Sequence, residues 1–354
     1  MAVVARARAQ WVVVAIVIVS AALATPAVEA GAVRLSRRHV LARTGAALGG
    51  TLLGAGGAPA LRPSRARAAN VPAYCDEAID VLASPTRKIY LCGTAHVSQD
   101  SALLVRSLIR SVRPSSVMIE LDEQRFASLM ASPAERKRAK GDSDLLRGLW
   151  ADLRGPGSLA DRIARAQSNA IGRSLSQLYE SMEGLGFESG DEFRVAATEA
   201  LDGGAQLVLG DQDVRTTLDS LRDALRSTDL RALFGAPPVQ LDSQSGERQA
   251  ALYGLASAGG GEEMDKEALG AMIATLKERQ NTRAIVLALQ ESTPALYTAL
   301  IAQRDAFMAR SLDAQCAGST IVAVVGMAHL DGIGRALLAA DPTLTAQPKR
   351  GCHV

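Results

Sequence analysis

Residues 88–121 read KIYLCGTAHVSQDSALLVRSLIRSVRPSSVMIEL, and this stretch decides the predicted fold. Its two ends, Lys88 to Cys92 and Ser116 to Leu121, are short apolar runs typical of buried strands. Between them, Gln99 to Arg113 has the spacing of an amphipathic helix. A strand, a helix and a second strand within about 30 residues form the βαβ unit from which parallel sheets are built. The residues expected on the apolar face of the helix are Leu103, Leu104, Leu108 and Val112.

Two further strands are predicted, at Gln206 to Leu209 and at Thr320 to Val325, each followed by a helical pattern. The predicted fold class is therefore α/β, with a mostly parallel sheet covered by helices. Two long helical regions, Ser143 to Ala200 and Gln244 to Ala314, are predicted to form a helical insertion between the strands. We interpret residues 69–354 as one domain that contains this insertion.

Two predicted strands are followed by the same short phrase, GTAH at 93–96 and GMAH at 326–329. The chain has four histidines, and these phrases hold the two that lie in the predicted folded body. In open parallel sheets, ligand sites lie at the carboxyl ends of the strands, and glycine permits a tight exit turn there. His96 and His329 are therefore expected to converge on one site.

A carboxylate is expected at the same edge of the sheet. Glu120 ends an apolar strand, and burying a carboxylate without a partner costs several kcal/mol. Glu120 should therefore face a cation. The sequence leaves open whether this cation is a metal ion or an arginine, and the available arginines are Arg125 and Arg304.

Other acidic candidates follow the predicted strands or begin helices. Asp211 ends the third predicted strand, Glu192 opens a helix, and Asp305 stands beside Arg304 at the start of another. Taken singly, Glu192 and Asp305 would also suit solvated acids in the first turn of a helix. Two histidines with one or two carboxylates suit Zn, Mn, Fe or Co, which activate a water or polarise a carbonyl. A carboxylate outside the ligand set would serve as general base.

The first 68 residues have the pattern of a targeting presequence. Two arginines precede an apolar run from Trp11 to Leu23, which suits a secretory signal or an uncleaved anchor. A twin-arginine phrase then follows at Ser36-Arg37-Arg38, with an A-x-A cleavage site at Ala66 to Ala68. Two successive addresses predict two membranes to cross. The arrangement resembles the presequences of lumenal thylakoid proteins in algae, and the alternatives are a bacterial periplasm or another secretory compartment.

Residues 69–354 number 286 and hold 30 basic and 36 acidic residues, a net charge of −6. Nucleic acid is therefore a poor candidate partner. No stretch after the presequence approaches the roughly 18 apolar residues of a membrane span, so none is expected there. The four cysteines include no C-x-x-C pair, which argues against a zinc ribbon or a thioredoxin motif. Cys92 is expected to be a buried apolar residue, and Cys75 and Cys352 could pair in an oxidising compartment.

With these residues in hand, the chain resembles the TraB/PrgY family, which is similar in turn to the Tiki-type metalloproteases and to the erythromycin-esterase and ChaN-like group. The matching phrases follow one another in family order from about Lys88 to Ala340. They are Gly93 to Ser98, Val117 to Leu121 with Arg125, Gly190 to Phe193, Gly210-Asp211, Arg304-Asp305 with Met308-Ala309, and Gly326 to Ile333.

This resemblance implies an α/β fold with one site and, in the Tiki branch, a peptidase that depends on a divalent metal ion: Mn, Co, Zn or Fe. The resemblance carries over His96, His329, Glu120 and Glu192 as metal ligands, and Glu192, Arg304 and Asp211 as catalytic or supporting residues. The chain departs from the family at Gln212, where an arginine is usual, and at Gln303, where a glutamate is usual. These two changes could compensate each other as a lost ion pair, or they could mark weakened catalysis.

The first functional hypothesis is a metal-dependent hydrolase that acts on a peptide or on a small ester or amide. The alternative is a non-catalytic regulatory protein that binds a peptide, a metal ion or haem. A third hypothesis is a redox or structural lumen protein that uses its cysteines. Metal content and turnover separate the first two, and titration of the thiols tests the third.

Overall fold

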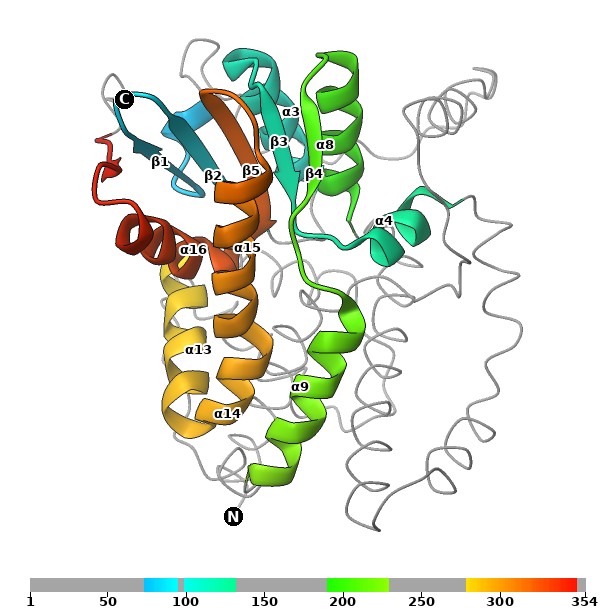
Figure 1. Cartoon of the computed structure of the whole chain (residues 1–354), viewed down its shortest axis with the longest axis vertical. Helices are drawn as coiled ribbons and strands as arrows, with labels where there is room; N and C mark the ends of the chain where they lie inside the picture. Colours follow the sequence, from blue (N-terminus) through cyan, green and yellow to red (C-terminus); the bar gives the residue numbers. More distant parts are fainter. Residues whose placement is uncertain (1–72, 95–98, 132–189, 229–277, 349–354) are drawn as a thin grey trace, which may run out of the picture.

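The computed structural model describes residues 73–94, 99–131, 190–228 and 278–348. These residues form an α/β fold around a six-stranded sheet with the strand order β4-β3-β5-β2-β1-β6 (Figure 1). Neighbouring strands among β4, β3, β5 and β2 run parallel, whereas β1 and β6 join the edge antiparallel. The predicted class, with its mostly parallel sheet covered by helices, is confirmed.

Four strands correspond to the predicted ones, and two were not predicted. The strands are β1 (Ile79–Ala83), β2 (Lys88–Thr94), β3 (Ser116–Ile119), β4 (Gln206–Leu209), β5 (Thr320–Gly326) and β6 (Thr345–Ala346). The unpredicted strands are β1 and β6. Since β6 has only two residues, both of them exposed, its sequence carries no apolar alternation that could reveal it.

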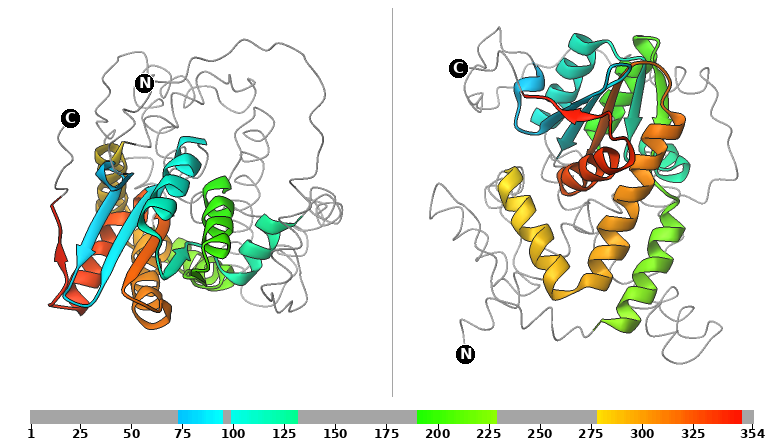
Figure 2. Two further views of the ribbon diagram at one scale, coloured as in Figure 1. Left: turned by 90° about the horizontal axis from the view of Figure 1, so that it is seen from above. Right: turned by 60° about the vertical axis from the view of Figure 1, so that its left-hand side comes forward.

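Helices cover both faces of the sheet and extend beyond its carboxyl edge (Figures 1 and 2). Parts of both regions predicted as the helical insertion are described, and these parts are helical: α8 in the first, and α13 to α15 in the second. The remainder of both regions lies outside the described residues. The helices are η1 (Ala73–Cys75), α3 (Gln99–Val112), α4 (Glu123–Met130), α8 (Asp191–Asp202), α9 (Val214–Ser227), α13 (Arg279–Ser292), α14 (Pro294–Tyr297), η2 (Thr298–Ala302), α15 (Gln303–Gln315) and α16 (Met327–Ala340).

The two central strands of the sheet are β5 and β2, and β5 pairs in parallel with β2 on one side and with β3 on the other. The register aligns Thr94, the last residue of β2, with Gly326, the last residue of β5. Ile119, the last residue of β3, pairs with both Val324 of β5 and Leu209 of β4. The carboxyl ends of four strands therefore lie along one edge of the sheet.

Each face of the sheet has its own apolar core. Side chains of α3 and α8 pack on one face, and side chains of α15 and α16 pack on the other (Figure 2). The placement of Leu103 on the buried face of α3 is wrong, because this side chain is 59% exposed. The other three predicted residues are confirmed: Leu108 is fully buried, and Leu104 and Val112 are partly buried against the same core. The helix also buries Val105 and Ile109.

The glycines at the strand ends do not act as predicted. Gly326 has φ −64°, a conformation open to any residue, so the expected glycine-specific exit turn is wrong there. Gly93 matters because of space: a β-carbon at this position would lie 2.9 Å from Met327 Sδ and 3.2 Å from Leu330 Cδ2. Its missing side chain lets α16 lie close against the sheet.

Cys92 is fully buried, as predicted. Cys75 forms a disulfide, and its expected partner, Cys352, lies outside the described residues, as does the whole presequence. Among the helices of the described ranges, none combines the length and apolar character needed to span a bilayer.

The central position of β2 predicts a large cost for a cavity there. We expect Leu91→Ala, at a fully buried position, to lower the free energy of unfolding by about 2–5 kcal/mol. The same truncation at exposed Leu103 should change it by less than about 0.5 kcal/mol. Urea unfolding followed by circular dichroism measures both, and equal losses would contradict the packing described for α3 and β2.

Candidate functional site

Three predicted site residues come together at the carboxyl edge of the sheet. Glu120 follows β3 directly, Asp211 follows β4 after one glycine, and His329 lies in the first turn of α16, just after β5. All three side chains are buried. Because these strands are neighbours in the sheet, their ends deliver the two carboxylates and the imidazole to one place.

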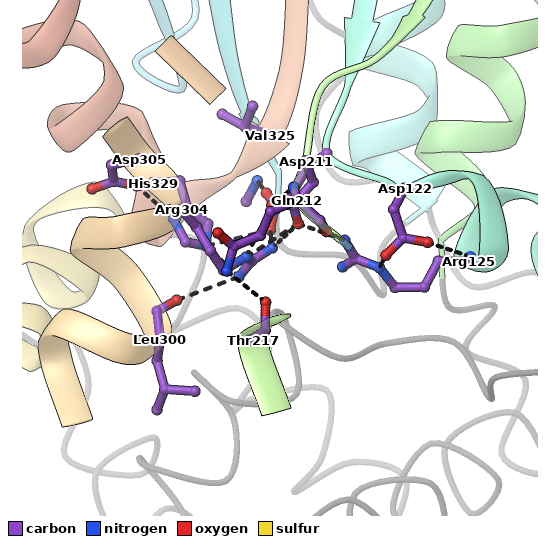
Figure 3. Close-up of polar contacts among 12 residues, drawn as sticks. Asp122, Arg125, Asp211, Gln212, Thr217, Leu300, Arg304, Asp305, Val325 and His329 are labelled. Atoms are coloured by element: carbon purple, nitrogen blue, oxygen red, sulfur yellow. Dashed lines mark hydrogen bonds and ion pairs between the residues drawn. The ribbon is translucent and has the colours of Figure 1, made fainter. Parts of the chain in front are cut away.

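The guanidinium of Arg304, on α15, lies at the centre of this group (Figure 3). Its Nη2 donates to Glu120 Oε1 and to Asp211 Oδ2, each at 2.5 Å. Its Nε lies 3.1 Å from Asp211 Oδ2, and the side chain is 0% exposed. The sequence left the cation facing Glu120 open, and among the described residues it is this arginine.

A π-helical turn precedes Arg304. This turn, η2, leads directly into α15, and Arg304 Nη1 points back towards the Leu300 carbonyl at 3.5 Å. Single π turns within helices are frequent at functional sites because the extra residue shifts the helical register. Arg304 and its neighbour Asp305 are both buried, so the interpretation of Asp305 as a solvated first-turn acid is wrong.

Glu120 connects Arg304 to the start of α16. Its Oε2 accepts a hydrogen bond from the backbone N–H of Gly326 at 2.5 Å, and Gly326 caps the N-terminus of α16. A carboxylate is favoured at this end of a helix, where backbone N–H groups and the helix dipole present positive charge. Glu120 therefore has two described partners, a guanidinium and a helix start.

His329 is held from both ring nitrogens. Nδ1 lies 2.6 Å from Asp305 Oδ1, and Nε2 lies 2.9 Å from Arg304 Nη1. Since a guanidinium can only donate, Nε2 accepts, and the proton of the neutral ring sits on Nδ1 and is donated to Asp305. Nε2 also lies 3.3 Å from Glu120 Oε1, but a proton on Nε2 would compete with the Arg304 donor, so we assign the Nδ1–H tautomer.

Asp305 fits this role because of what surrounds it. Burial raises the pKa of its carboxyl, and the contact with His329 opposes that rise. On its other side the carboxylate packs against Gly332 of α16, where a β-carbon would overlap Asp305 Oδ2. A glycine at this helical position thus leaves the space in which Asp305 can reach the imidazole.

Asp211 joins Arg304 to a second buried arginine. Arg125, on α4, donates from Nη2 to Asp211 Oδ2 at 2.6 Å and from Nε to Asp122 Oδ2 at 2.8 Å. Burial alone would raise the pKa of Asp211, but the guanidiniums of Arg304 and Arg125 outweigh it and hold that pKa well below its ordinary value. Asp122 was not predicted. It caps α4 by accepting a hydrogen bond from the Arg125 backbone N–H. Its position three residues after β3 is the feature of the sequence that could have identified it.

We call the seven residues Glu120, Asp122, Arg125, Asp211, Arg304, Asp305 and His329 the edge cluster. The edge cluster holds four carboxylates and two guanidiniums, all in buried residues. If every carboxylate is ionised and His329 is neutral, negative charge exceeds positive charge by two within this set.

Glu192 lies on the other face of the sheet. It lies in the first turn of α8, and α8 packs with Cys92 and α3 on the face opposite α15. Burial and the nearby carboxylates of Asp76 and Glu192 raise the pKa of the Cys92 thiol, which is therefore not a reactive nucleophile. The role of Glu192 as ligand or base stays a prediction.

His96 lies outside the described residues, so its meeting with His329 stays a prediction. The described chain stops before it at Thr94, whose hydroxyl donates to the Val325 carbonyl at 3.3 Å. Within the described ranges, no group of three or more His, Cys, Asp and Glu side chains is arranged to hold a metal ion. The two residues that depart from the family pattern lie in different environments. Gln212 is buried and donates to Thr217 Oγ1 at 2.9 Å, whereas Gln303 is exposed.

Residues 240–341 match the family described as TraB/PrgY/gumN. The described part of this match includes Arg304, Asp305 and His329. Over 250 residues the chain is 29% identical to a protein of Methanocaldococcus jannaschii named "Uncharacterized protein MJ1365". That alignment covers 70% of this chain and 53% of the relative, so the chain spans about half the length of the protein it matches.

The central position of Arg304 predicts a strong effect of removing its charge. We expect Arg304→Met to lower the free energy of unfolding by about 3–5 kcal/mol, because Glu120 and Asp211 lose a buried counter-charge. Arg310→Met, at an exposed position of the same helix, should cost less than about 0.5 kcal/mol. Chemical denaturation measures both, and a small loss at Arg304 would show that the edge cluster is not held by this arginine.

Two glycines in α16 should respond in opposite directions to alanine. Gly332→Ala pushes on the Asp305 carboxylate and should lower stability by about 1–3 kcal/mol. Gly334→Ala meets only Leu91 Cδ1, at an ordinary 3.7 Å, and should raise stability by up to about 1 kcal/mol, the helix propensity gain. Thermal and urea unfolding of the two variants decide this, and a stabilised Gly332→Ala protein would contradict the position assigned to Asp305.

Proposed function

Given that the chain is a member of the TraB/PrgY/gumN family, with the family match at residues 240–341, we propose that it is a hydrolase that depends on a divalent metal ion. The proposed substrate is a peptide or a small ester or amide. The observation that carries the proposal is the state of His329. Its Nδ1 proton is held by Asp305, which leaves the Nε2 lone pair directed at the carboxylate-rich edge cluster.

This arrangement is the one that metal-binding histidines use. A ligating imidazole almost always donates its other N–H to a carboxylate or a carbonyl, which fixes its orientation and makes the ligand nitrogen more basic. Nε2 and Glu120 Oε1 lie 3.3 Å apart, so a cation with bonds of about 2.0–2.2 Å to nitrogen and oxygen would be able to contact both. His96 is the proposed third ligand, and Mn, Co, Zn or Fe suits such a set.

Arg304 now makes the contacts that the metal ion would make. Its Nη1 donates to His329 Nε2 and its Nη2 donates to Glu120 Oε1. Metal binding therefore requires these two donors to turn away. The metal ion would then lie beside Arg304, between His329 Nε2 and Glu120 Oε1. Asp211 and Leu300 would retain the displaced guanidinium nearby, since Arg304 contacts both.

The bound metal would polarise a substrate carbonyl and supply a nucleophile from water at neutral pH. Arg304, once turned, would donate to the developing oxyanion, and Asp211 would keep it oriented. Glu192 is the proposed general base or fourth ligand, a role that depends on its reaching the metal from the α8 face. The relation to Tiki-type peptidases points to the same chemistry and is itself part of the proposal.

The contacts that Arg304 makes in the structure, with Glu120 and His329, suggest a second candidate function. Glu120 and His329 already have a cation between them, which suits a non-catalytic regulatory protein that binds a peptide, a metal ion or haem. For either function we propose the thylakoid lumen as the compartment, with a bacterial periplasm or another secretory compartment as alternatives. A fluorescent reporter fused to residues 1–70 tests this address.

Metal content and turnover test the proposal together. The purified chain should contain about one Mn, Co, Zn or Fe per molecule by mass spectrometry, and a chelator should remove both the metal and the hydrolysis of fluorogenic peptides. His96→Ala and Glu120→Gln should abolish both. Bound metal without turnover would favour the regulatory protein, and the absence of metal would exclude the proposed mechanism.

A matched pair of aspartates on α15 tests the role of His329. Asp305→Asn should weaken metal binding by roughly 10–100-fold, because the imidazole loses the carboxylate that fixes its tautomer. Asp313→Asn, whose side chain is 66% exposed and pairs with Arg87, should leave the affinity unchanged. Competition with a metal-binding dye measures both, and equal affinities would count against His329 as a ligand.

A further inference from the structure

A cavity of about 520 Å³ lies between α13, α16 and the β1–β6 edge of the sheet. Its volume falls within the roughly 300–1,000 Å³ of small-molecule sites. The cavity lies outside the edge cluster except at Asp305, which lines the cavity and also contacts His329.

Much of the cavity wall is apolar. Val286 and Leu287 line it from α13, Ile301 from η2, and Leu338 from α16. Leu287 is 54% exposed, an unusual degree for a large apolar side chain that faces a concave surface. Walls of this kind bind the hydrocarbon part of a ligand, because its burial removes apolar surface from water.

The acidic side chains that line the cavity are already paired. Asp80 binds Arg279, and Asp331 binds both Arg279 and Arg283. Asp305 binds His329. Their negative charges are therefore engaged and do not select a cationic ligand.

Arg335 is different. It lines the cavity from α16 and is exposed, and no ion pair joins it to any acidic residue of the described ranges. Among the described residues that line the cavity, Arg335 therefore carries the one unengaged charge, and this charge is positive. A planar guanidinium donates favourably to a carboxylate, which it can hold with two parallel hydrogen bonds.

We propose that this cavity binds an organic monocarboxylate with an alkyl body. The carboxylate pairs with Arg335, and the alkyl chain lies against Val286, Leu287, Ile301 and Leu338. Asp305 also lines the cavity, so the occupant shares a wall with the residue that contacts His329. This binding site stands on the cavity alone and does not depend on the proposed metal or hydrolysis.

Titration calorimetry with decanoate as the probe tests the site on the full chain. Decanoate should bind with saturation at one molecule per chain. Octanoate, which is two methylenes shorter, should bind about fifteenfold more weakly, because each buried methylene contributes a factor of about four. Decanol should also bind at least about tenfold more weakly, because it lacks the charge that pairs with Arg335. The proposal would be overturned if decanoate binding did not saturate, or if decanol bound with the same affinity as decanoate.

Three variants locate the probe. Arg335→Gln should weaken decanoate binding at least about tenfold, and Val286→Trp, which fills the cavity, should abolish it. Arg310→Gln is the matched control at an exposed arginine outside the cavity, and it should bind as the wild type does. Equal losses in the two glutamine variants would indicate general charge attraction and overturn the site. Since Arg335 is exposed, its variant should fold even if the tryptophan variant does not.

Discussion

The described structure depends on one buried guanidinium. Arg304 has no access to water, so its charge must be met by protein groups, and those groups come from the end of β3, the end of β4 and the first turn of α16. Their meeting requires the observed strand order, with β5 between β2 and β3. The edge cluster therefore depends on the sheet topology. A change that displaces any of these strands would also leave a buried charge without its partner.

Much of this edge could be predicted from the sequence, for a physical reason. Parallel strands buried on both faces appear as continuous apolar runs, and their carboxyl ends align without knowledge of the long segments between them. Glu120 could be identified because an acid within such a run needs a partner. Asp211 and His329 follow strands in the same way. The local pattern thus located three of the residues that meet around Arg304, and the family pattern pointed to Arg304 itself.

What remained undetermined depends on choices that a local pattern does not record. Glu120 can be satisfied by a metal ion or by an arginine, and an apolar run that ends in a glutamate does not distinguish between them. The face of the sheet that α8 covers, and hence the position of Glu192, depends on connections far along the chain. Leu103 was misplaced because several faces of α3 contain apolar residues, and packing against α8 selects one of them.

The central position of β5 has a consequence for how the molecule is made. Thr94 and Val325, which share a hydrogen bond, are 231 positions apart, and β5 is the last of the parallel strands to leave the ribosome. Until it arrives, β2 and β3 have no neighbour on their facing edges, and bare strand edges invite pairing with other chains. Closing such a long loop also slows folding. A nascent chain of this protein therefore keeps two strand edges open to wrong pairing until β5 has emerged.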